Sequence, residues 1–557
     1  MSNVNQQNWT IRNQLSYNRN WNTDLHQLSL LVGQEAQEQR ETTNGSLVRG
    51  YNDLLQSFGA VDYATLGVTG VTGPVMPNNA GRSILTNDIF NQADRQTRFT
   101  SYYANTGYTF DRKYVLNGSF RVDQSNLFGL DKSAQNKPIW SVGGKWILSS
   151  ERFMKDLMWL NHLATRATYG LTGNSPAPGT AASYDILATQ RSSFLPGGVG
   201  LRVATPSNAK LTWESTSTVN LGLDFALLNN QISGSVDVYR KKTDNLLGYL
   251  PTNTFTGYAS IVGNLGDLEN KGIELSLNTL NIRKGDFKWN TIFNVAYNKN
   301  TITKLNLGAP VTTGRDRVNQ QYVAGYPAFA VFAYEYAGLD NMGDPQIKLA
   351  DGTVTKTPNV SKVNDAKYMG TYQPVWSGGV ANVFNYKSFS LSANAVFNLG
   401  HVMRRDVNGF YYGRILHGNI ENLSTGAGFK GGNLHADFAA RWRQPGDESH
   451  TNIPSYVANP AISTARRDVT HYTRGDINVV SASFVKLRDI TLGYSLPALL
   501  LDNLKADQVT FRLQLSNVML WKANKDGIDP EFISATFGNR SMLANQNAVS
   551  FGLNVKF

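Results

Sequence analysis

The sequence has no cysteine among its 557 residues. That absence excludes disulfide frameworks, thiolate metal sites and cysteine nucleophiles. Long apolar runs are missing as well: no stretch approaches the roughly 18 apolar residues that a membrane-spanning helix needs, so a helical membrane protein is excluded. Proline is scarce beside glycine, at 18 against 50, which is typical of a chain of many strands and turns.

Clustered positive charge is also lacking, although the formal net charge is +11. Lysine and arginine are mostly scattered singly, with short groups such as those at 240–242 and 404–405. Nucleic-acid binding calls for a basic patch or stripe. We therefore expect no nucleic-acid partner, and we assign these charges to solvated loops or to the lining of a lumen.

The first eight residues, MSNVNQQN, have no basic segment and no apolar core, so they are not a signal peptide. At 557 residues a soluble protein would need about three or four domains, and no linker separates such domains.

Aromatic residues are abundant, at 11% of the chain, and the last nine residues alternate between apolar and small or polar types. The apolar positions are Val549, Phe551, Leu553, Val555 and Phe557. This period of two predicts a strand with one apolar and one polar face. In a soluble sheet such an edge would invite aggregation, whereas in a membrane barrel the apolar row would face lipid.

The same period recurs along the chain, mostly in pairs joined by tight turns. The predicted strand segments are 9–17, 28–36, 102–110, 114–122, 140–148, 163–171, 219–225, 232–238, 273–277, 287–297, 380–386, 389–399, 490–496, 509–515 and 549–557. Residues 39–97, 173–207 and 400–480 are predicted to be mostly long loops.

About fifteen strands that alternate between tight turns and long loops indicate an all-β, antiparallel transmembrane β-barrel. Outer-membrane barrels have short periplasmic turns and long extracellular loops, and aromatic girdles at both membrane interfaces. A sandwich or propeller would have shorter strands and more even spacing.

Motifs for catalysis are few and lack their structural context. The seven histidines show no ligand-pair spacing and are interpreted as surface or loop residues: His26, His162, His401, His417, His435, His450 and His471. Residues 426–431 (GAGFKG) match G-x-G-x-x-G without a preceding strand or following helix, and Gly144-Lys145-Trp146 lies inside a predicted strand.

Two carboxylate pairs could suggest glycosidase acids or a Ca²⁺ site: Asp529 with Glu531, and Asp340 with Asp344. Each lies in a turn that contains glycine, where acids usually bond to nearby backbone. We expect no enzyme, no cofactor and no metal, and we assign no catalytic or substrate-binding residue.

A set of longer segments carries more specific motifs. They are 169–174 (YGLTGN), 211–214 (LTWE), 220–225 (NLGLDF), 237–247 (DVYRKKTDNLL), 269–274 (ENKGIE), 441–447 (RWRQPGD), 484–497 (FVKLRDITLGYSLP), the segment around Asn517, and 527–531 (GIDPE). In order and across essentially the whole chain, they resemble the barrel of SusC/RagA-type TonB-linked outer-membrane transporters.

The resemblance implies a nutrient importer of the cell outer membrane in Bacteroidota. Members of this family take up glycans or oligopeptides through a barrel plugged by an amino-terminal domain. It also implies a SusD-like surface lipoprotein, TonB–ExbB–ExbD and outer-membrane lipid as partners. The substrate would touch long extracellular loops and polar positions facing the lumen.

Relative to the family, the signal peptide, the TonB box, the plug and about four to eight strands of a 22-stranded barrel are missing. We interpret residues 1–557 as the carboxy-terminal part of such a barrel, from a truncated gene or an incomplete sequence, with a split gene as an alternative. The expected consequence is either an unpaired edge at 549–557 or a forced closure of that strand onto residues 9–19.

Two other hypotheses stay open at this point. A plugless porin or structural and binding barrel, complete in itself, predicts pairing of residues 9–19 with the terminal strand. A soluble all-β enzyme acting on polysaccharide needs two carboxylates converging in a cleft, about 5 to 10 Å apart.

Overall fold

The computed structural model of the chain describes most of its length. The described residues are 2–47, 51–68, 70–72, 82–83, 90–131, 136–177, 180, 184–191, 199–252, 254–258, 260–306, 311–320, 322–407, 409, 411–412, 415–416, 419–420, 435–497, 500–501, 505–532 and 547–557.

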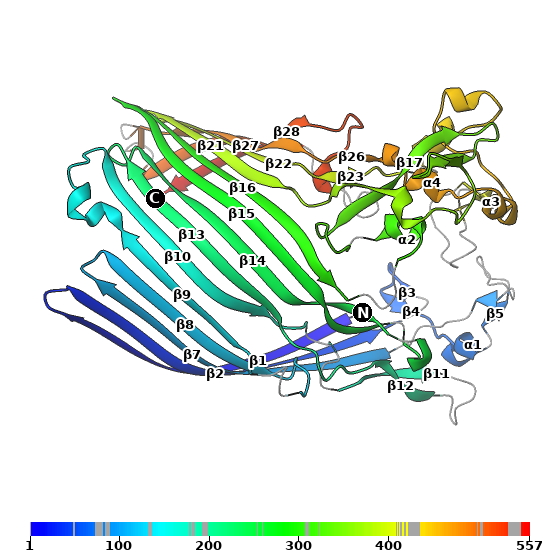
Figure 1. The fold of residues 1–557 in the computed structure, drawn as a ribbon, viewed down its shortest axis with the longest axis horizontal. Helices are drawn as coiled ribbons and strands as arrows, with labels where there is room; N and C mark the ends of the chain where they lie inside the picture. The colour runs from blue at the N-terminus through cyan, green and yellow to red at the C-terminus, as the bar shows by residue number, and fades with distance from the viewer. Residues whose placement is uncertain are drawn as a thin grey trace.

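A single antiparallel sheet of fifteen strands forms the body of the molecule (Figure 1). In spatial order its strands are β1 (Ser2–Trp21), β2 (His26–Ser46), β7 (Phe90–Phe110), β8 (Tyr114–Ser125), β9 (Pro138–Ile147), β10 (Leu160–Asn174), β13 (Glu214–Leu227), β14 (Ile232–Pro251), β15 (Ser260–Lys284), β16 (Phe287–Leu305), β21 (Trp376–Tyr386), β22 (Phe389–Leu399), β27 (Phe484–Ser495), β28 (Gln508–Lys522) and β29 (Ala548–Lys556). Each strand pairs with the next one of the sheet along the chain, so the order is a simple up-and-down meander.

Every predicted strand segment matches one of these fifteen strands, and only Leu148, Leu496 and Phe557 fall one residue beyond a strand end, so the predicted all-β antiparallel fold is confirmed. The tight turns at 22–25, 111–113, 228–231, 285–286 and 387–388 gather at one end of the sheet, and the long connections gather at the other (Figure 1). This segregation matches the turn and loop ends of outer-membrane barrels.

Cross-strand register turns the alternation of single strands into continuous faces. Across six strands from β13 to β22, one row is apolar: Leu221, Val238, Ile273, Tyr297, Trp376 and Leu399. A row on the opposite face, from β13 to β21, is small or polar: Asp224, Ser235, Ser276, Asn294 and Gly379. Leu221 and Val238 are 57% and 50% exposed. The sheet therefore turns an apolar face outward without covering it.

Aromatic side chains line the turn end of the sheet. Trp21 stacks on His26 with ring centroids 5.0 Å apart, and Tyr114 lies 6.2 Å from both Phe110 and Trp146. Phe389 and Tyr494 repeat the arrangement further round the sheet, at 4.6 Å. Rings with an apolar body and a polar edge suit a boundary between hydrocarbon and water.

The two outermost strands have one sheet neighbour each. Within the described residues β1 pairs only with β2, and β29 pairs only with β28. Of the two expected outcomes at residues 549–557, the structure therefore has the unpaired edge, and the forced closure onto residues 9–19 is absent. The apolar row of β29 is exposed, from 37% at Val555 to 83% at Phe557.

The strands reach further into the loop side than their apolar period indicated. Residues 39–46 and 90–97, predicted as loop, belong to β2 and β7, where Arg40 pairs with Asp94 and Arg98 with Glu38 at 2.7 Å. Both faces are polar there, so no alternation marks the strands. The predicted loop 173–207 likewise includes a hairpin of β11 (Ile186–Arg191) and β12 (Val199–Thr205).

The buried core lies mainly outside the large sheet, in two loops that fold against each other. The described parts of residues 311–375, between β16 and β21, and of residues 400–483, between β22 and β27, together form what we call the loop subdomain. Its first loop carries a four-stranded sheet of β19 (Val354–Thr355), β18 (Pro345–Lys348), β17 (Ala330–Leu339) and β20 (Ala366–Thr371). Val318, Tyr334 and Ile347, each at most 3% exposed, form one of its clusters.

The second loop, predicted as mostly loop at 400–480, contains β23 (Val402–Arg404), β26 (Val479–Ser481), α3 (Pro460–Arg466) and α4 (Thr470–Thr473). In α3 the side chain of Asn459 caps the amides of Ala461 and Ile462, with Pro460 in the first turn. Both are strong start signals for a helix. Within the first loop, α2 (Gly314–Asn319) packs against β17. Across the loops, α4 packs against β17 and β18.

The remaining elements are short. They are β3 (Tyr51–Asn52), β4 (Ser57–Phe58), α1 (Tyr63–Val68), β5 (Val71–Thr72), β6 (Arg82–Ser83), β24 (Ile415–Leu416), β25 (Asn419–Ile420) and 3₁₀ turns at 148–150, 152–154, 254–256, 363–365, 436–440, 447–449, 476–478 and 530–532. Among the described residues, no helix has the length and apolar character to cross a bilayer.

Candidate functional site

The polar face of the sheet is hollowed. A cavity of about 630 Å³ lies on it, bordered by side chains of β1, β2 and β7 to β10 such as Asn18, Asn105, Ser119 and Arg166. A second hollow of about 420 Å³ lies nearer the loop end, beside Arg12, Glu35 and Arg121. The face opposite the exposed apolar rows is therefore a concave, hydrogen-bonding surface.

Charges on this face are held in a ladder across four strands, β9, β10, β13 and β14. Asp224 of β13 accepts hydrogen bonds from Lys145 at 3.1 Å and from Arg166 at 2.9–3.1 Å. Arg166 also reaches Asp237 of β14 at 3.1 Å, and Asp237 accepts from Asn220 at 3.0 Å. With each carboxylate matched by a cation, the wall is polar and nearly neutral, which suits non-covalent contact with a polar solute or a polar domain.

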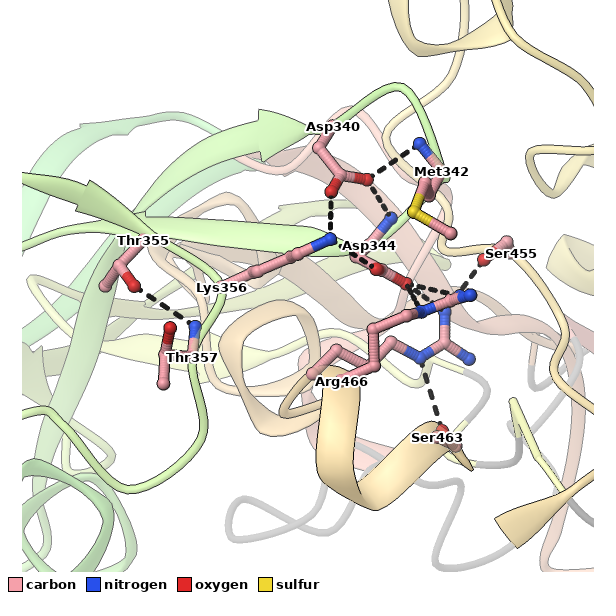
Figure 2. Close-up of polar contacts among 10 residues, drawn as sticks. Asp340, Met342, Asp344, Thr355, Lys356, Thr357, Ser455, Ser463 and Arg466 are labelled. Carbon is pink, nitrogen blue, oxygen red and sulfur yellow. Dashed lines mark hydrogen bonds and ion pairs between the residues drawn. The ribbon is translucent and has the colours of Figure 1, made fainter. Parts of the chain in front are cut away.

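The loop subdomain lies at the end of the sheet where the long connections gather (Figure 1). It is held together by the fully buried Asp344 (Figure 2). Its Oδ1 accepts hydrogen bonds from Arg466 Nη2 at 2.7 Å and Arg467 Nη1 at 3.2 Å, and its Oδ2 accepts from Lys356 Nζ at 3.0 Å. Lys356 belongs to the first loop and both arginines to the second. One carboxylate therefore joins the two loops.

Asp340, four residues earlier, plays a local part in the same cluster. Its Oδ1 accepts from the amides of Met342 and Asp344 at 2.9 Å, and its Oδ2 accepts from Lys356 (Figure 2). Burial alone would lower the pKa of Lys356, but its bonds to the two carboxylates outweigh burial and raise that pKa. The interpretation of these acids as backbone-capping residues holds for Asp340 and is wrong for Asp344.

The other predicted pair, Asp529 and Glu531, also has a buried cation between its members. Lys486 of β27 is 1% exposed and donates to Asp529 at 2.9 Å and to Glu531 at 2.8 Å, while Arg488 takes the second oxygen of Glu531. Burial alone would raise the pKa of Glu531, but bonds from Arg488 and Lys486 lower it overall. These acids anchor the 523–532 segment to the sheet as well as capping its turn.

Two of the histidines interpreted as surface or loop residues are buried. His401 is 8% exposed, and its burial lowers the pKa of the imidazole to about 4. His471 is 1% exposed and meets Tyr334 edge-on at 5.3 Å. Burial depends on packing between distant loops, and no local sequence signal marks it.

The remaining histidines do not converge. His26 stacks in the aromatic belt and His162 lies in β10, whereas His435 and His450 lie in the second loop and His417 is outside the described residues. The G-x-G-x-x-G at 426–431 is also outside them, and Gly144-Lys145-Trp146 is inside β9 as predicted. In the described part of the chain, no group of three His, Asp or Glu side chains is placed to hold a metal.

Taken together, the site is a concave polar face with a folded loop subdomain at one end, and both predicted acid pairs are engaged by lysine and arginine. This arrangement offers surfaces for binding and passage rather than a pair of acids free for hydrolysis. An up-and-down antiparallel sheet with an apolar outer face and a polar inner face is the wall of a transmembrane β-barrel.

Residues 3–518 match the family described as TonB dependent receptor-like, beta-barrel, and the chain belongs to that family. It is 27% identical to TonB-dependent receptor P39 of Formosa agariphila over 98% of this chain and 52% of the relative. It is also 27% identical to TonB-dependent receptor SusC of Bacteroides thetaiotaomicron, over 72% of this chain and 38% of SusC. The chain thus spans about half the length of the curated relatives it matches, or less.

A solved structure with the same fold is that of the RagAB peptide transporter, with a TM-score of 0.76 at 22% identity. The match covers 100% of this chain and 56% of that one. The predicted resemblance to SusC/RagA-type TonB-linked transporters is confirmed by the family and by these relatives.

Proposed function

We propose that the chain forms the carboxy-terminal wall and loop region of a TonB-dependent nutrient importer in the cell outer membrane. The observation that carries this proposal is the fifteen-stranded meander, with its exposed apolar face and its hollowed polar face. Membership of the TonB-dependent receptor family supports it.

Unpaired edges support a larger barrel. Each edge strand presents unused backbone donors and acceptors, which cannot stay unsatisfied in hydrocarbon. Strands between β29 and β1 would satisfy both edges at once. If the complete barrel has 22 strands, seven remain to be supplied, within the four to eight expected from sequence.

The cargo in this proposal is a glycan or an oligopeptide. It would contact the loop subdomain first and the polar inner face next. The peptide class draws on the RagAB peptide transporter, and the glycan class on the SusC-type resemblance. A SusD-like surface lipoprotein would cover the loop end, and TonB–ExbB–ExbD would act through a plug within the closed barrel.

Growth on defined nutrients tests this function. A strain of the native host without the gene should lose growth on one glycan or peptide mixture and keep growth on monosaccharides or free amino acids. Deleting tonB should abolish the same growth, and fractionation should place the protein in the outer membrane. Uptake that persists without TonB would overturn energy-coupled import.

The plugless porin or structural barrel has less support. It predicts pairing between residues 9–19 and the terminal strand, and the described residues contain no such pair. A porin would also admit solutes in a strain without TonB, so the growth experiment separates the two. The soluble enzyme is disfavoured because both carboxylate pairs are neutralised by cations.

A further inference from the structure

A cavity of about 350 Å³ lies between the two loops of the loop subdomain. Five arginines from four separate stretches of sequence line it: Arg315, Arg404, Arg405, Arg467 and Arg474. Among the described lining residues, Asp468 is the one acid. Such a concentration of guanidinium groups around one small space is costly unless anions balance it.

Arg467 and Arg405 have carboxylate partners. Arg467 bonds to Asp344 at 3.2 Å, and Arg405 reaches Asp526 at 3.3 Å. Arg404 and Arg315 form no ion pair with a described carboxylate. Asp468 is occupied locally, because its Oδ1 accepts from the amide and hydroxyl of Thr470 at 2.9 and 2.7 Å.

Arg404, at the end of β23, gives the sharper indication. It is 3% exposed, and its Nη2 donates to the carbonyls of Val318 at 3.1 Å and Phe332 at 2.6 Å. No ion pair to a described carboxylate balances this charge. A buried cation without a carboxylate partner is unfavourable unless an anion balances it. An anion in the cavity that Arg404 lines would supply that balance.

The neighbouring charges act in the same direction. Burial, together with repulsion from Arg404, lowers the pKa of Arg474 to about 10. Burial also lowers the pKa of Arg404, and the nearby Tyr372 offsets this only in part. Guanidinium groups stay protonated in proteins at neutral pH, so each would gain from a negative charge in the cavity that both arginines line.

We propose that this cavity binds a tetrahedral oxyanion group, phosphate or sulfate, either as the free ion or as an ester carried by a larger molecule. Guanidinium groups match such oxygens in bidentate geometry. The volume is at the lower end of ligand sites, so it fits one small group with its water rather than a folded partner. The proposal does not depend on the importer function.

Calorimetric titration of the intact detergent-solubilised protein with inorganic phosphate and inorganic sulfate tests the free ions. Glucose 6-sulfate and glucose 6-phosphate test the esters, and glucose is the neutral control. We expect saturable binding of at least one oxyanion probe and none of glucose. Binding of the esters alone would assign the site to an ester group.

Variants place the binding in the cavity. Arg315→Gln, an exposed position on α2, should weaken affinity about five- to tenfold, which is the size of one charge-assisted contact. Asp468→Asn should strengthen affinity a few-fold by removing the acid, a gain that misfolding cannot produce. Lys367→Gln, on β20 of the same subdomain, removes an equal charge away from the cavity and should leave affinity unchanged.

The proposal is overturned if no oxyanion probe binds to folded protein. It is equally overturned if Lys367→Gln weakens binding as much as Arg315→Gln, because the effect would then be general attraction to a basic protein.

Discussion

Replacing Lys486 by methionine should release the 523–532 segment from the sheet. The substitution keeps the length of the side chain and removes the charge that lies between Asp529 and Glu531. It also removes the ammonium from over the ring of Phe532, 4.9 Å away. Two carboxylates then face an apolar side chain, and only Glu531 keeps a cation, Arg488.

The size of the effect follows from burial. Removing one partner of a buried ion pair costs about 3–5 kcal/mol. Here both acids are 19% exposed at the side chain and Arg488 remains. We therefore expect Lys486→Met to lower the free energy of opening the 523–532 segment by about 2–3 kcal/mol. At 1.4 kcal/mol per factor of ten, the segment should open roughly 30- to 140-fold more often.

Amide hydrogen exchange over residues 523–532 measures this opening directly, because the loss is local. Arg488→Met is the matched control: it lies on the same strand and binds the same Glu531, but its side chain is 41% exposed. An exposed pair contributes about 0–1 kcal/mol, so this variant should accelerate exchange less than about fivefold.

Acid should weaken the same anchor. The pKa of Glu531 is lowered in the folded protein, so its contribution is complete above the ordinary glutamate value and is lost as pH falls through the lowered one. Protection of 523–532 should therefore fall below about pH 4.5. Exchange within threefold of wild type in Lys486→Met, or an equal effect of Arg488→Met, would refute the reasoning.

Three further predictions concern other parts of the molecule. Because burial lowers the pKa of His401 to about 4, its contribution to stability is complete above pH 6.5 and declines towards pH 4. Protection of residues 400–404 and 479–483 from amide hydrogen exchange should therefore fall over that range in wild type and not in His401→Phe. Asp344→Asn leaves the fully buried Arg467 without its carboxylate and should lower the stability of the loop subdomain by about 3–5 kcal/mol. Proteolysis within 340–360 and 455–467 should become faster, and unchanged cleavage would contradict the role of Asp344 in joining the loops. Leu221→Arg, on the apolar face, should destabilise the barrel in liposomes by about 2–4 kcal/mol, whereas Thr218→Arg, on the polar face of the same strand, should be nearly neutral. Equal losses would contradict the assignment of the lipid face.

The large sheet could be predicted from sequence because each membrane strand needs an alternating apolar row to face hydrocarbon. Outside the hydrocarbon a strand needs no apolar row, so the alternation of apolar residues stops there. Residues 37–46 continue β2 for ten positions beyond the last predicted apolar residue, held by backbone pairing and ion pairs such as Arg98 with Glu38. The backbone is paired as a strand there, but the side chains are those of a solvated surface.

The loop subdomain was not predictable in the same way. Residues 330–339 (AVFAYEYAGL) form β17, a continuous apolar run that a buried strand can have, but a short run of this kind fits a buried helix equally well. No local periodicity in the sequence indicates which loops pack together. The buried state of His401 and His471 and the convergence of the arginines follow from that packing, so none of them could be found from sequence.

The sequence motifs themselves acquire a physical reason from the structure. The segments at 484–497 and 527–531 were recognisable as motifs, but nothing in either explained its residues. Lys486 of the first bonds to Asp529 and Glu531 of the second, and Arg488 completes the cluster. Buried cations and carboxylates constrain one another, because replacing either alone leaves the other as an unpaired buried charge. Lys486 and Asp529, 43 residues apart in the sequence, should therefore vary together or not at all. A variant that exchanges the two residues should recover part of the protection lost in either single substitution.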